Sequence, residues 1–88
     1  MATWSLTTKH TQQRGDADTT ADAWDAAYRA AAEHVRARVL GPISLEVDGD
    51  HASVHPAESG DLHTDVANTL DGIESSRLAA LAAHRDAQ

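Results

Sequence analysis

Apolar and polar positions alternate near the start of the chain. Residues 2–8, ATWSLTT, place Trp4 and Leu6 on one side and hydroxyl-bearing residues on the other. A period of two is typical of a strand with one buried face. The pattern therefore predicts a strand over residues 2–8.

The same period recurs in ISLEVDGDHASVH, residues 43–55. Either Asp48-Gly49 or Gly49-Asp50 can form the two-residue turn of a hairpin within it. Both turns set Ala52 and Val54 on the face that carries Ile43, Leu45 and Val47. We expect a hairpin with strands over 43–48 and 51–55, ended by Pro56.

A helical period governs the segment between Thr19 and Gly41. At about 100° per residue, most of the large apolar residues of this segment and several alanines fall on one side of a helix. These are Trp24, Ala27, Tyr28, Ala31, Val35 and Val39. Thr19 is placed to cap the first turn, and Gly41-Pro42 favours a left-handed cap followed by a stop. The spacing predicts a helix over 19–40.

Helical spacing returns near the end of the chain, over residues 62–86. Its apolar stripe includes a charged residue, and its members are Leu62, Val66, Leu70, Ile73, Arg77, Leu81 and His84. Gly72 interrupts the run, and a glycine inside a helix costs about 1 kcal/mol relative to alanine. Two short helices broken near Gly72 are the alternative, but we favour one long helix over 62–86.

These elements, in the order β-α-β-β-α, predict an α+β fold in a single domain, residues 1–88. Residues 9–18 contain no apolar residue except Ala17, so we expect a connector there. The 33 residues from Lys9 to Gly41 suffice for a right-handed crossover, which would make the strands over 2–8 and 43–48 parallel. We therefore expect a three-stranded mixed sheet with two helices packed on one face, and no internal repeat is visible.

Composition points to a thin core. Of the 36 hydrophobic residues, 18 are alanine, whose methyl group buries little area. Self-association commonly supports such small domains, so we expect a homo-oligomer or an assembly subunit. Without cysteine the chain has no disulfides and no thiolate ligands. Because no signal peptide or membrane-spanning run is visible, the sequence favours a soluble protein in the cytoplasm or in a virion.

The net charge of −7 limits the classes of partner that the chain is expected to bind. Direct binding of nucleic acid is disfavoured because it depends on clustered lysine and arginine. We expect no membrane partner and no cofactor. A protein partner, or a second copy of the chain, agrees best with this composition.

Glu46, His51 and His55 form the best chemical cluster in the sequence. His51 faces Glu46 across the predicted hairpin, which suits a solvated pair or part of a metal site. His51 and His55 lie about 13 Å apart at strand rise, which is too far for one ion unless the strand bends. These three residues are weak metal candidates, and no catalytic residue is assigned.

Four further residues are candidates for an interface: Trp24, Tyr28, Arg77 and His84. The two aromatic residues fall on the predicted core face, and tryptophan is also a frequent interface anchor. Arg77 lies within an apolar stripe, so its head either reaches solvent or meets an acid across a contact with another chain.

The leading functional hypothesis is a non-catalytic protein-interaction or assembly module, a structural component of a larger cellular or viral complex. One alternative is an acidic inhibitor that binds a basic partner, as antitoxins and nucleic-acid mimics do. Another is a small metal-dependent enzyme that uses the Glu46, His51 and His55 face.

Overall fold

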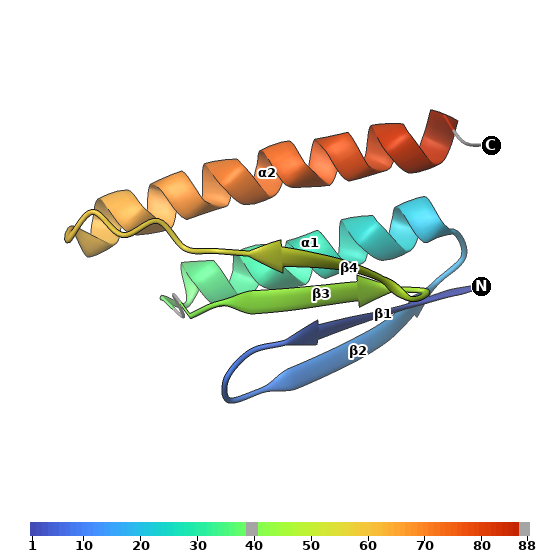
Figure 1. Cartoon of the computed structure of the whole chain (residues 1–88), viewed down its shortest axis with the longest axis horizontal. Helices are drawn as coiled ribbons and strands as arrows, with labels where there is room; N and C mark the ends of the chain where they lie inside the picture. The colour runs from blue at the N-terminus through green and yellow to red at the C-terminus, as the bar shows by residue number, and fades with distance from the viewer. Residues whose placement is uncertain (39–40, 87–88) are drawn as a thin grey trace.

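The chain forms a four-stranded antiparallel sheet with two helices on one side of it (Figure 1). The computed structural model describes residues 1–38 and 41–86. In chain order the elements are β1 (Ala2–Thr7), β2 (Gln12–Ala17), α1 (Thr20–Arg36), β3 (Ile43–Val47), β4 (Asp50–Val54) and α2 (Leu62–Asp86). The spatial order of the strands is β2-β1-β3-β4. The α+β class is confirmed, whereas the prediction of a three-stranded mixed sheet is wrong.

The unpredicted strand is β2, which lies inside the expected connector 9–18. A tight turn joins β2 to β1. In this turn the Thr8 N–H donates to the Thr11 carbonyl over 2.8 Å. The residues of β2 that share a face with the core residues of β1 are Gln13, Gly15 and Ala17. None of them is a large apolar residue, so the strand leaves no alternating pattern in the sequence.

Gly15 has a packing role in this hairpin. It pairs with Trp4, and a Cβ at Gly15 would lie 2.6 Å from three atoms of the Trp4 indole. Only glycine leaves room for the ring to lie against the β2 backbone, which is a common reason for glycine inside a strand. Trp4 thereby becomes buried.

The β1–β2 hairpin also reverses the chain before it enters α1, so the connection through α1 starts from β2 and not from β1. β1 pairs antiparallel with both β2 and β3, so the predicted parallel pairing of 2–8 with 43–48 is wrong. The crossover through α1 instead joins β2 to β3, which run in the same direction on either side of β1. An extra reversal of the chain before α1 explains the difference.

α1 begins as predicted and ends earlier than predicted. The Thr19 hydroxyl caps it by accepting from the Asp22 N–H over 3.1 Å. The helix ends at Arg36, and Arg38 takes the left-handed conformation with φ of 66°, where Gly41 had been expected to do so. Of the rest of the predicted span, residues 37–38 form a turn, and residues 39–40 lie outside the described residues.

The β3–β4 hairpin turns at Asp48-Gly49, the first of the two predicted turns. Both residues have positive φ, 50° and 93°, as the mirror-image turn favoured in hairpins requires. The strands are 43–47 and 50–54, one residue off the predicted bounds. The register places Ala52 opposite Leu45 and Val54 opposite Ile43, so the predicted shared face is confirmed.

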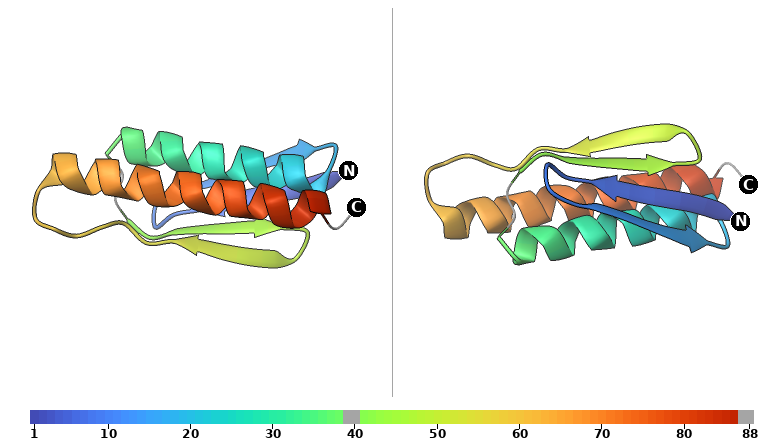
Figure 2. Two further views of the ribbon diagram at one scale, coloured as in Figure 1. Left: turned by 90° about the horizontal axis from the view of Figure 1, so that it is seen from above. Right: turned by 90° about the horizontal axis from the view of Figure 1, so that it is seen from below.

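α2 is one continuous helix through Gly72, as favoured from the sequence. α1 lies directly on β1, β2 and β3, whereas α2 lies mainly alongside α1 (Figure 2). The core fills the space between the sheet and α1, and Ile73 of α2 reaches it. Within residues 1–38 and 41–86, no helix lies over the opposite face of the sheet.

The fold contains a repeat that the sequence does not reveal. Each half is a hairpin followed by a helix, β1-β2-α1 and β3-β4-α2, and the two helices run in opposite directions (Figure 1). Leu6 and Leu45, 39 positions apart, pair directly across β1 and β3. The same shift of 39 carries the pair Trp4–Gly15 onto the pair Ile43–Val54. The two hairpins are thus related by an approximate two-fold axis through the centre of the sheet, whereas the helices depart from it, since α1 lies on the sheet and α2 lies alongside α1.

Candidate functional site

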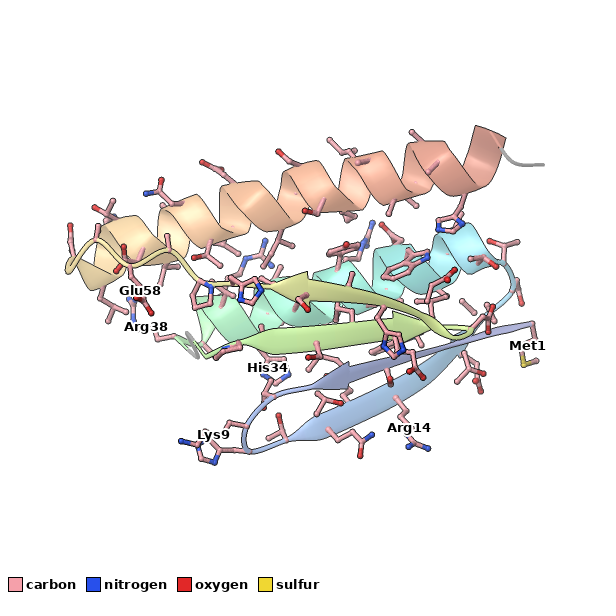
Figure 3. All side chains as sticks on the ribbon, in the orientation of Figure 1. Met1, Lys9, Arg14, His34, Arg38 and Glu58 are labelled. Carbon is pink, nitrogen blue, oxygen red and sulfur yellow. The ribbon has the colours of Figure 1, made fainter. Side chains whose placement is uncertain are left out.

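A row of polar residues crosses the uncovered face of the sheet. The strand registers place Arg14, Ser5, Glu46 and His51 side by side, one from each strand in spatial order. Directly paired residues of adjacent strands share a face, so all four side chains are on the side away from the core. Arg14 points away from the helices in Figure 3. The sequence could not predict this row because Arg14 lay in the expected connector.

Polar residues flank this row on both sides. Thr7, Gln12 and Ser44 lie on one side of it, and Thr3 and Asp16 lie on the other. Two shallow hollows, of about 220 and 330 Å³, border Ser5, Arg14 and Glu46. The face can donate and accept hydrogen bonds over four strands.

The predicted contact between Glu46 and His51 is formed. Their closest atoms, Oε2 and Nε2, are 3.3 Å apart, and the side chains are 49% and 73% exposed. His55 lies just beyond β4, which ends at Val54. Within the parts of the chain that the structure describes, no three histidine, aspartate or glutamate side chains gather closely enough to hold a metal ion. A metal could here meet the Glu46 carboxylate and the His51 imidazole together.

Carboxylates collect at the end of the molecule where the N-terminus, the β3–β4 turn and the start of α1 meet (Figure 1). Thr3 links two of them, since its backbone N–H donates to Asp48 over 3.2 Å and its hydroxyl donates to Asp16 over 3.3 Å. Asp18, Asp22 and Asp50 belong to the same end. These five acids give the end a strongly negative surface. Lys9 and Arg38 lie at the other end (Figure 3).

The four interface candidates come together between α1 and α2 of the same chain. The Trp24 ring stacks against Tyr28, with centroids 5.8 Å apart, and against His84 of α2, with centroids 5.9 Å apart. Trp24 and Tyr28 are buried, at 5% and 7% exposure. Burial raises the pKa of the Tyr28 phenol. The indole N–H of Trp24 is buried and has no hydrogen-bond partner among the described residues.

Arg77 meets its acids within the chain rather than in solvent or across a contact with another chain. Its guanidinium lies 2.7 Å from Asp25 of α1 and 2.6 Å from Glu74 of its own helix, and its side chain is 19% exposed. Hydrogen bonding to Glu74 and then to Asp25 raises the pKa of Arg77. The hydrogen bond from Arg77 lowers the pKa of Glu74. Arg77 therefore fastens α2 to α1.

Polar side chains of α2 also hold the loop that precedes it. Asp61 caps the helix, and the Thr64 hydroxyl donates to its carboxylate over 2.7 Å. This hydrogen bond, with a second from the His63 N–H, lowers the pKa of Asp61. The buried Asp65 accepts from the backbone and the hydroxyl of Ser59, and Thr69 accepts from the Ala57 N–H. The chain between β4 and α2 is thereby tied against the helix.

Comparison with known proteins finds no matching family model, no matching curated protein and no matching solved structure. Neither helix in the described part of the chain combines the length and the apolar character that crossing a membrane requires. The function is therefore inferred from the geometry of the chain itself.

Proposed function

We propose that this chain is a non-catalytic protein-interaction module that associates with protein through its open sheet. The observation that carries the proposal is the coverage of the sheet on one face only. Over residues 1–38 and 41–86, one face and the outer edges of β2 and β4 have no covering element. An open edge presents unpaired backbone donors and acceptors, which favour pairing with a further strand.

The composition of the core supports the proposal. Of the 18 hydrophobic residues buried in the described chain, seven are alanine. At about 25 cal/mol per Å² of buried apolar surface, such residues leave a small margin over the entropy of the chain. Association with protein adds buried area that the chain cannot supply alone.

The chemistry of the exposed face also favours binding over catalysis. The closest acid–base pair, Glu46 and His51, lies on an open surface where water reaches both side chains. Active sites are usually concave and exclude water. An uncovered face with many hydrogen-bonding groups is better suited to recognition of another protein surface.

Light scattering after size exclusion tests the proposal in its self-associating form. We expect a mass above the 9.3 kDa of one chain at micromolar concentration. A monomer that unfolds in one cooperative transition would count against self-association. The form with a different partner is tested by co-purification from the native source, and an absence of any stoichiometric protein would count against it.

The carboxylate-rich end favours a second candidate, an acidic inhibitor of a basic protein. Asp16, Asp18, Asp22, Asp48 and Asp50 give this end a charge complementary to a basic surface. Binding would then weaken steeply as the Debye length falls from about 10 Å at 0.1 M salt to about 3 Å at 1 M. Recovered partners that are not basic, or a complex indifferent to salt, would contradict this candidate.

The metal-dependent enzyme stays a prediction. Metal analysis of the purified protein is its direct test, because Glu46 and His51 supply only two neighbouring ligands. Absence of stoichiometric zinc, manganese or iron would leave it without support.

A further inference from the structure

The outer edge of β4 offers a defined set of unpaired backbone groups. Val47 and Asp50 flank the two-residue turn, so they form a hydrogen-bonded pair, and such pairs recur at every second residue. Asp50, Ala52 and Val54 therefore direct their N–H and C=O groups to β3. His51 and Ser53 direct theirs to the outer edge, where the described chain supplies no further strand.

A hollow of about 210 Å³ lies beside this edge, between β4 and α2. Its walls include Val54, the small residues Gly72 and Ser76, and the hydrogen-bond donors His55 and Asn68. A Cβ at Gly72 would meet no other atom within 4 Å, so the hollow is open there. Side chains of an added strand that point to the core side of the sheet would meet these walls.

We propose that a second copy of the chain pairs its β4 antiparallel with this edge, with Ala52 of each copy at the two-fold axis. The proposal deepens the proposed function, because it names the partner and the strand. His51 then lies opposite the partner's Ser53, and both pairs of outward backbone groups are satisfied. The partner's Asp50 lies opposite Val54, where its carboxylate can accept from His55, Asn68 and Ser76 around the hollow.

This register is self-complementary. It sets Ala52 opposite the partner's Ala52 in a close, non-hydrogen-bonded pair, where small side chains cause no conflict. It places no two like charges directly opposite each other, a condition that stable cross-strand pairs require. An acid of each copy enters a hollow that supplies neutral donors and a histidine.

The edge of β2 lacks this complementarity. The hollow beside it, between β2 and α1, is lined by Gln13, Glu33, His34 and Ala37. The core-side residues that a second β2 would bring there are Gln13, Gly15 and Ala17, none of which is charged. Both edges present unpaired backbone groups, but only the side chains at the edge of β4 are complementary to those of a second copy. We therefore assign the pairing to β4.

Matched proline variants at the two edges test the assignment. Ser53→Pro removes an outward N–H from β4, and Arg14→Pro, at the equivalent position 39 residues earlier, removes one from β2. Proline is tolerated in an edge strand when its nitrogen faces outward. Light scattering is expected to give a wild-type mass of about twice 9.3 kDa, a twofold fall for Ser53→Pro and no change for Arg14→Pro. Circular dichroism checks that each variant is folded.

A single cysteine tests the register even if a proline variant fails to fold. The chain contains no cysteine, so Ala52→Cys introduces the only thiol. A close antiparallel pair with Cα atoms about 4.5 Å apart is within the range that a disulfide spans, about 4.4–6.8 Å. Mild oxidation is expected to link most Ala52→Cys chains in pairs and few Gln13→Cys chains, the equivalent site on β2.

The outcomes separate the inference from the proposed function. A dimer that persists in Ser53→Pro, or that links at Gln13→Cys and not at Ala52→Cys, overturns the β4 pairing while self-association stands. A wild-type monomer from micromolar to millimolar concentration overturns the β4 pairing and self-association together. Binding to a different protein is then judged by co-purification alone.

Discussion

At the scale of the residue, Gly15 decides whether β2 can lie beside β1. Its missing side chain gives the Trp4 indole the space that the ring occupies, since an added Cβ would lie 2.6 Å from three ring atoms. The rest of β2 has little apolar surface of its own. The hairpin therefore depends on one close contact between an aromatic ring and a backbone.

Replacing Gly15 with alanine is expected to destabilise the fold by about 1–3 kcal/mol, the usual cost of overpacking a well-filled site. Urea unfolding at neutral pH measures the change. Gly72→Ala is the matched control, because its Cβ enters open space and its helix gains up to about 1 kcal/mol from the better helix former. Equal stability of Gly15→Ala and the wild type would contradict the packing of Trp4 on β2.

The capping carboxylate of Asp61 predicts a dependence of stability on pH. Hydrogen bonds from Thr64 and His63 hold the pKa of Asp61 below its ordinary value of 3.8 in the folded chain. The unfolded chain therefore binds the proton first as the pH falls, and stability present above pH 3.8 is lost as the pH falls through the lowered pKa. Glu74 adds a loss of the same sign, beginning near its ordinary pKa of 4.5.

The variant Asp61→Asn separates the contribution of Asp61 to the loss of stability in acid from that of Glu74. Asparagine is as good a helix cap as aspartate, so the variant is expected to remain folded at pH 7 and to lose less stability than the wild type between pH 5 and 3. Urea midpoints across that range give the comparison. A wild-type midpoint that does not fall on acidification would contradict the assigned hydrogen bonds of both carboxylates.

At the scale of the element, the sequence predicts what depends on local signals. Thr19 marks the start of α1, and Asp48-Gly49 fixes both the β3–β4 turn and the facing of Glu46 and His51. The spacing in 62–86 predicts a helix that continues through Gly72.

The features that the sequence does not predict depend mainly on pairing between distant segments. β2 has no apolar alternation, and its burial comes from Trp4 on another strand, so nothing within residues 9–18 indicates a strand. The polar row is hidden for the same reason, because Arg14 joins Ser5 and Glu46 only after β2 forms. The end of α1 is missed because Arg38, a residue with a side chain, takes the conformation expected of Gly41.

The contact between the helices gives a prediction at this scale. Asp25 pairs with Arg77 across the helices and with Arg29 within α1, so the two arginines share one partner. Arg77→Met is expected to lower the melting temperature by several degrees and to speed amide exchange in α2, because it leaves Asp25 without its cross-helix partner. Arg29→Met is the control, since its side chain is 71% exposed and pairs of this kind within a helix contribute about 0.3–0.5 kcal/mol. Equal effects of the two substitutions would contradict a fastening role for Arg77.

At the scale of the whole molecule, two hairpins surround an approximate two-fold axis, and the described helices lie on one side of the sheet that they form. The inner strands β1 and β3 pair with each other, so the two outer strands carry all the unpaired edges of the described chain. α1 covers the sheet, and α2 leaves a hollow beside β4. The proposed assembly uses that edge to repeat, between two copies, the antiparallel pairing that already joins the two halves of one copy.

Amide hydrogen exchange as a function of protein concentration tests this account most directly. The amides of His51 and Ser53 face the outer edge of β4, and those of Arg14 and Asp16 face the outer edge of β2. If β4 pairs with β4 of a second copy, exchange at His51 and Ser53 slows as the concentration rises from micromolar to millimolar, while exchange at Arg14 and Asp16 keeps its rate. Fast exchange at His51 and Ser53 at every concentration would contradict this pairing.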